Sequence, residues 1–183
     1  GSKLAMSPDG RTLSLTTNIG IGTESIMLFD MQTQTKIAGF SDMFASRTVF
    51  LPDSRHLLAG GQSHAMRLID TAYGAQIDRI SLAITPEIIG SRQYDFASSP
   101  DLERVVLTSL FDPSVPDSSQ VPVHLAVYDL TSGELLGQYN PPGLLNVRDS
   151  AFINADEVLT TLHDGTLLIW NVDTGEEVSR LSV

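Results

Sequence analysis

Short apolar stretches alternate with polar, turn-forming segments along the whole chain. The stretches are rich in β-branched and aromatic residues, and they recur in pairs at 11–17 and 25–29, 55–59 and 66–69, 103–110 and 121–128, and 157–162 and 166–170. Runs of this length bounded by turn residues are typical of strands. No window carries a sustained helical period with caps. The pattern therefore predicts an all-β chain.

Turn motifs recur in the same order in each segment, which indicates four tandem repeats. The first motif is a Pro-Asp turn, in which proline presets φ and aspartate caps the local backbone. Its copies align on Asp9, Asp53, Asp101 and, in a degenerate form, Ala155. A second turn follows residues 29–30, 69–70, 128–129 and 170–171, and in two copies Gly133 and Gly175 can supply a positive φ.

Each repeat thus holds four short strands, named A to D. Strand A precedes the Pro-Asp turn, B follows it, C ends in an Asp or Asn, and D follows the second turn. We expect four four-stranded antiparallel sheets, the blades of a β-propeller, at about 3–40, 44–80, 92–139 and 146–183 of a single domain. Strands that are apolar on both faces fit this arrangement, since each blade packs between two others.

The repeats carry a family resemblance that covers nearly the whole chain. Residues 163–175 resemble the end of a WD-repeat unit, and residues 7–13 resemble its start. The chain is equally similar to bacterial propellers with Ser-Pro-Asp-Gly and Thr-Gly turns. It departs from WD repeats because only one copy has the tryptophan and the Gly-His pair is missing. The family's Asp-His-Ser/Thr-Trp network is therefore not carried over.

Rings of the kind that the chain resembles hold more than four blades. We therefore expect a partial ring, which is either a fragment of a longer propeller or half of a ring that a second copy completes. Either way the first and last blades would expose apolar faces, and such faces mark interfaces.

Charge and composition narrow the partners. The 183 residues include 11 basic and 22 acidic ones, a formal net charge of −11, so nucleic acid and anionic membrane surfaces are unexpected partners. There is no cysteine, which excludes disulfides, thiolate metal sites and cysteine nucleophiles. Gly1-Ser2 resembles a pair left by protease cleavage, so we assign no targeting signal and no compartment.

Longer connections gather at one end of the expected blades. The A–B and C–D turns are short, whereas long D–A and B–C connections run at 81–93, 111–122 and 140–147. Loops on a rigid scaffold concentrate binding residues. At the same end Lys3, Arg47, Asp95 and Asp149 occupy one equivalent position near the start of strand A. The candidate binding residues are Arg47, Arg92, Tyr94, Asp95, Phe111, Asp112, Asp117, Arg148 and Asp149. The alternative is that they are solvated strand ends with weak ion pairs.

Signals for other chemistry are weak. His56, His64, His124 and His163 show no paired ligand spacing, and the loop with Asp112 and Asp117 lacks a spaced run of calcium ligands. We expect no metal and no cofactor. Trp170 is expected in the packing between blades.

The sequence favours a non-catalytic scaffold that binds a protein or peptide through the loop-rich face around the third blade. The resemblance to WD repeats implies the same function. One alternative is a ligand-sensing domain of a larger signalling protein. Another is an enzyme that uses the channel mouth, where Asp95 and Asp149 offer a carboxylate pair. Expected partners are a protein or peptide and either a second copy or further blades.

Overall fold

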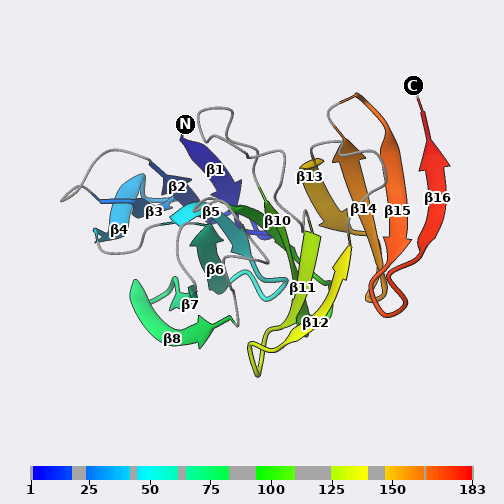
Figure 1. Cartoon of the computed structure of the whole chain (residues 1–183). Helices are drawn as coiled ribbons and strands as arrows, with labels where there is room; N and C mark the ends of the chain where they lie inside the picture. The colour runs from blue at the N-terminus through cyan, green and yellow to red at the C-terminus, as the bar shows by residue number, and fades with distance from the viewer. Residues whose placement is uncertain are drawn as a thin grey trace, which may run out of the picture. The chain divides into compact units, whose positions relative to one another are not determined.

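The computed structural model describes residues 2–17, 24–41, 45–61, 65–82, 94–109, 125–139, 147–162 and 164–182 (Figure 1). All hydrogen-bonded elements among these residues are strands, and they form four four-stranded antiparallel sheets. Each sheet lies within one repeat and runs in sequence order, so the predicted β-propeller blades are confirmed. None of the described segments is a helix long and apolar enough to cross a membrane.

The chain divides into two compact units, residues 1–81 and 82–183, each with two blades. The first blade contains β1 (Lys3–Met6), β2 (Thr12–Thr16), β3 (Ile26–Asp30) and β4 (Thr35–Phe40). The second contains β5 (Ala45–Phe50), β6 (His56–Gly61), β7 (Ala65–Asp70) and β8 (Ala75–Ser81).

The second unit repeats this order. The third blade contains β9 (Tyr94–Ser98), β10 (Arg104–Ser109), β11 (Leu125–Asp129) and β12 (Leu135–Tyr139). The fourth contains β13 (Val147–Phe152), β14 (Glu157–Leu162), β15 (Leu167–Asn171) and β16 (Glu177–Leu181). The B and C strands predicted from the apolar stretches are thus confirmed, apart from residues 121–124, which lie outside the described residues.

Side-chain caps close the A–B turns as predicted. Asp9 Oδ1 accepts the amide of Arg11, and Asp101 Oδ1 accepts that of Glu103. In the fourth blade the cap is Asn154, whose Oδ1 accepts the amides of Asp156 and Glu157. The cap thus lies one residue before the aligned Ala155, because the A–B turn of the fourth blade is one residue shorter. Its closing bond joins the amide of Ile153 to the carbonyl of Glu157, four residues later, whereas the equivalent bonds in the other blades span five residues.

The C–D turns share both their caps and their backbone conformation. Asp30, Asp70, Asp129 and Asn171 each accept the amide two residues later. The left-handed residues of these turns are Gln34, Gly74, Gly133 and Gly175, with φ of 57°, 58°, 76° and 69°. Positive φ at Gly133 and Gly175 is as predicted. Gln34 holds the same conformation with a side chain, which strains its backbone.

A β-bulge follows each C–D turn. The register between strands C and D shifts at Leu28/Phe29, Leu68/Ile69, Val127/Tyr128 and Ile169/Trp170. The extra residues in strand D are Ile37, Ile77, Leu136 and Val178, and all four are exposed. Bulges increase strand twist, so the four blades share one local shape as well as one topology.

The core of the first unit lies between its two blades. Ile26 and Leu28 of β3 pack with Leu57, Ala59 and Ile69 of the second blade. A buried hydrogen bond of 2.6 Å joins the hydroxyls of Ser14 in β2 and Thr48 in β5. The blades of this unit are therefore stacked face to face.

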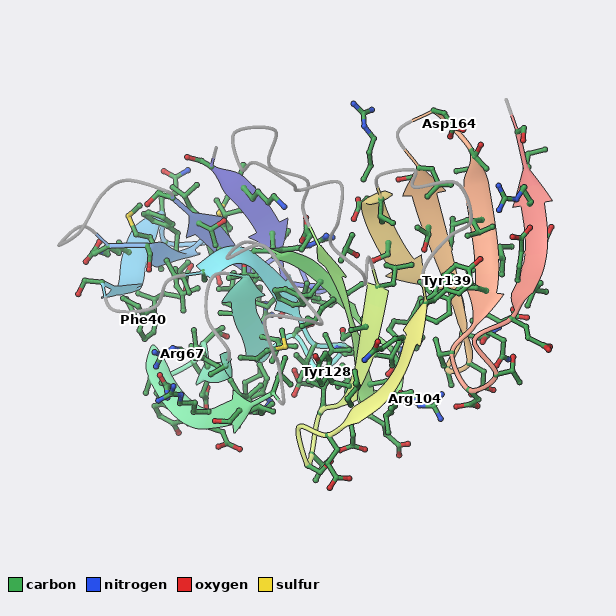
Figure 2. All side chains as sticks on the ribbon, in the orientation of Figure 1. Phe40, Arg67, Arg104, Tyr128, Tyr139 and Asp164 are labelled. Atoms are coloured by element: carbon green, nitrogen blue, oxygen red, sulfur yellow. The ribbon has the colours of Figure 1, made fainter. Side chains whose placement is uncertain are left out.

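The two blades of the second unit are stacked on each other in the same way. Val106, Leu125 and Val127 of the third blade pack with Val158 and Trp170 of the fourth. Trp170 is fully buried, as predicted, and its indole donates to Thr160 Oγ1 at 3.1 Å. Its ring stacks on Tyr139 of β12, with centroids 5.1 Å apart, on the side of β12 that faces the fourth blade (Figure 2). Thr108 and Ser150 supply the buried hydroxyl pair here, at 2.5 Å.

Candidate functional site

Each blade has two unlike ends. We call the end with the A–B and C–D turns the turn end, and the end with the B–C and D–A connections the loop end. The strand bounds place the longest connections, 82–93, 110–124 and 140–146, at loop ends of the second unit. The predicted one-sided elaboration is thus present in the lengths of the connections. Arg92, Phe111, Asp112 and Asp117 lie in these connections, outside the described residues.

The four charged positions predicted to be equivalent are equivalent in register. Lys3 pairs with Thr16, Arg47 with Gly60, Asp95 with Thr108 and Asp149 with Thr161. Thr16, Thr108 and Thr161 in turn pair with residues four before the Asp or Asn that ends strand C. Each blade therefore places a charged residue at the same point near the loop end of its strand A.

Hydrogen bonds to strand B hold this position. Thr16 Oγ1 donates to the carbonyl of Lys3 at 3.2 Å, and Thr161 Oγ1 donates to that of Asp149 at 3.4 Å. The carboxylates of Asp95 and Asp149 each accept the amide of the following residue at 2.9 Å. The backbone at the loop end is thus fixed in the same way in more than one blade.

Exposure separates the predicted residues. Asp95 is buried, with 6% of its surface exposed, whereas Arg148 and Asp149 are exposed and Arg47 is half-buried. Tyr94 begins β9 opposite Ser109. Arg148 and Asp149 are therefore exposed loop-end charges of the second unit, as Lys3 is in the first, whereas Asp95 lies inside its sheet.

The sign of the charge differs between the units. Lys3 and Arg47, the strand-A charges of the first unit, are basic, and Asp95 and Asp149, those of the second, are acidic. Equivalent backbone positions thus carry opposite charges, which the repeat pattern alone does not require. The fold therefore does not determine the sign of the charge at this position.

The turn end is dominated by internal contacts. Arg55 binds Asp70 with two nitrogens, at 3.0 and 2.6 Å, and its guanidinium lies 5.5 Å from the ring centre of Tyr73. The bond from Arg55 lowers the pKa of Asp70, and the amide of Ser132 lowers that of Asp129. Cap acceptors here are engaged by the chain's own amides.

Sequence reasoning missed one cation at this end. Arg104 of β10 lies between the blades of the second unit, with its guanidinium 3.4 Å from Asp156 and 3.0 Å from Asp173 (Figure 2). It also donates to the carbonyl of Ala155 at 3.3 Å. The only signal in the sequence is that Arg104 follows the Asp101 turn, and this does not specify partners as distant in the chain as Asp156 and Asp173.

Metal ligands were not expected, and the described part of the chain contains no group of three or more histidines and carboxylates arranged to hold a metal ion. His56 lies in β6, and the other three histidines are outside the described residues.

Comparison with known proteins gives no family. A scan against models of protein families finds no match, and a search of curated proteins finds no significant relative. The fold and the loop-end geometry therefore carry the functional argument.

Proposed function

We propose that this chain is a non-catalytic scaffold that binds a protein or peptide at the loop ends of its blades. The observation that carries the proposal is the contrast between the two ends. Short self-capped turns occupy one end, and long connections together with an exposed charge pair, Arg148 and Asp149, occupy the other. Rigid sheets that present loops on one side are a recurrent design for recognition.

Charge favours a partner with basic groups. The net charge of −11 attracts cationic surfaces and repels polyanions over a Debye length. Arg148 beside Asp149 adds a local dipole that a partner's side chains can pair with. Exposed pairs of this kind contribute to the rate and specificity of association more than to affinity.

The test compares the two ends directly. A photo-crosslinking amino acid is placed at Arg148 on the loop end or, as a matched control, at Tyr73 on the turn end, which is 78% exposed. We expect a discrete crosslinked protein only from position 148 in cells that express the chain. Equal labelling from both positions would contradict the proposal.

A charge variant completes the design. Arg148→Asp with Asp149→Arg keeps the net charge but reverses the dipole at two exposed residues. Because the change removes the hydrogen bond from the Ser150 amide to Asp149, circular dichroism is used to check that the sheet is retained. With the probe at the exposed Asp164, on the B–C turn of the same blade, we expect the crosslinked product of this variant to be at least several-fold weaker than that of the parent chain. Asp95 is unsuitable for this purpose because it is buried.

A further inference from the structure

One face of the first blade is apolar and exposed. Ser14 points toward the second blade, where it bonds Thr48, and alternate residues of a strand point to opposite sides. Leu13 and Leu15 therefore face away from the second blade. Pairing places Met6 and Phe29 beside Leu13, and Leu4 and Met27 beside Leu15. These six residues form what we call the first-blade outer face.

The exposure of this face is high for its composition. Leu4 is 68% exposed and Met6 is 48% exposed, while the other four residues are half-buried. Contiguous apolar surface of this kind marks a contact site.

Equivalent faces in other blades show what covers such a surface. The row Met6, Leu13 and Phe29 corresponds in register to Phe50, Leu57 and Ile69 in the second blade, and to Phe152, Val158 and Trp170 in the fourth. Both of those rows pack against the preceding blade of their own unit. The first-blade outer face is thus built to receive a preceding blade.

The fourth blade carries the complementary surface. Trp170 packs on the third blade, so Leu167 and Ile169, at odd spacing from it along the strand, point the other way. Leu167 pairs with Leu181, which is 60% exposed. Their equivalents in the third blade are Leu125, Val127 and Tyr139, which cover the following blade. We call Leu159, Leu167, Ile169 and Leu181 the fourth-blade outer face.

We propose that two copies of this chain associate head to tail, with the fourth-blade outer face of one copy packed on the first-blade outer face of the other. The contact continues the blade-to-blade interface already present in each unit. Leu181 would take the place of Tyr139, and Phe29 of the second copy would take the place of Trp170. Such a pairing is heterologous, and it forms a closed ring when the second contact is made in the same way.

The packing within the second unit favours two copies over closure by one. Strands lie about 5 Å apart, so β12 and β15 run about 14 and about 10 Å from the innermost strands of their sheets. In a closed ring of four blades, neighbouring sheets would lie at right angles, and β12 and β15 would then be at least about 17 Å apart. Rings stacked 5.1 Å apart at an interplanar angle of 12° do not span that gap. In a ring of eight blades the angle between neighbouring sheets is half as large, which brings β12 and β15 close enough for the contact between Tyr139 and Trp170. Two copies of this chain supply eight blades.

Sedimentation velocity and light scattering test the proposal. We expect the purified chain to have about twice the 19.8 kDa mass of one copy. Met6→Glu together with Leu4→Glu should give a monomer, as should Leu181→Glu. Tyr73→Glu is the matched control, since Tyr73 is more exposed than any of them but lies on a turn. Far-UV circular dichroism should be unchanged in all variants, because the altered side chains are exposed.

Mixing the two monomeric variants tests the head-to-tail pairing. A mixed dimer retains one intact contact, between the wild-type fourth blade of one variant and the wild-type first blade of the other. We expect partial recovery of dimer on mixing and none in either variant alone. No recovery would contradict head-to-tail pairing. A monomeric wild-type chain would overturn the proposal. Neither outcome bears on binding at the loop end, which uses other residues.

Discussion

At the residue scale, the turns show where this sequence departs from the best choice for its own fold. Gly74, Gly133 and Gly175 fill the left-handed position of their C–D turns, whereas Gln34 fills it in the first blade with φ of 57°. A side chain in this region costs about 1–2 kcal/mol. Because residue 34 is the one C–D turn residue of the four that carries a side chain in this conformation, substitutions there test whether the turn is left-handed.

Gln34→Gly should raise the free energy of unfolding. The relief of strain exceeds the extra chain entropy of glycine, so we expect a gain of about 0.5–1 kcal/mol. Gln34→Ala removes the same side chain but keeps the Cβ, and it should give no gain. Urea denaturation of the three proteins measures the effect. A glycine variant less stable than the alanine variant would show that residue 34 is not left-handed.

Gly74→Ala should be more harmful than Gly10→Ala. Both residues have positive φ, at 58° and 72°, and so share the left-handed penalty of about 1–2 kcal/mol. A Cβ at residue 74 would also lie 2.5 Å from the Cβ of Ala38, whereas one at residue 10 meets nothing within 4 Å. Thermal unfolding should therefore show a clearly larger loss for Gly74→Ala. Equal losses would mean that the turn of the second blade does not approach β4.

At the element scale, neighbouring blades are held by a small set of repeated contacts. A buried hydroxyl pair joins β2 to β5 and another joins β10 to β13, in each case beside an apolar cluster. Polar groups inside an interface favour one alignment, because any shift leaves them without partners. Blade stacking in this chain therefore depends on hydrogen-bond matching as well as on apolar area.

Thr108→Val should destabilise the second unit by about 1–3 kcal/mol, since it leaves the buried Ser150 hydroxyl without this partner. Adding Ser150→Ala should cost less than the sum of the single changes, and a double-mutant cycle in urea measures the coupling. Thr35→Val is the control, because Thr35 pairs with Thr33 in the same way but is exposed. Additive effects of the two buried substitutions would contradict the direct contact.

The sequence predicted the elements well and their partners poorly. Pro-Asp turns and strand-C aspartates are local signals, so the strands followed from them. The cap at Asn154 was missed because the turn there is degenerate. Arg104 and the Ser14–Thr48 pair were missed because their contacts cross between blades, and a repeat pattern specifies which residues form a sheet but not which side chains meet across two sheets.

Of the candidate site, the equivalence of Arg47, Asp95 and Asp149 was predictable, since register follows from alternation. The burial of Asp95 was not.

At the scale of the whole molecule, the turn carboxylates link stability to pH. Hydrogen bonds lower the pKa of cap residues in the first three blades, with the Ser7 hydroxyl acting on Asp9 and the Ser99 hydroxyl acting on Asp101. A carboxylate with a lowered pKa in the folded state binds protons more readily when unfolded. Its contribution is complete above the unfolded value near 3.8 and is lost as pH falls through the folded value.

Stability should therefore be flat above about pH 5 and should fall steadily below pH 4. Urea titrations at successive pH values measure this, and Asp129→Asn provides the control, because an amide keeps the oxygen acceptor but does not titrate. The variant should show a shallower acid limb than the parent chain. If stability falls equally at low pH in both proteins, the Asp129 cap does not depend on the charge of its carboxylate.

Engineered disulfides test the central claim, that each repeat folds as a sheet and that the two sheets of each unit are stacked face to face. The chain has no cysteine, so any disulfide comes from the introduced residues. Ser14→Cys with Thr48→Cys, and separately Thr108→Cys with Ser150→Cys, should each oxidise to an internal disulfide, seen as a loss of free thiol and a shift on non-reducing gels. Leu13→Cys with Thr48→Cys should stay reduced, because Leu13 faces away. Oxidation of that control pair, or free thiols in both test pairs, would contradict the stacking of the blades.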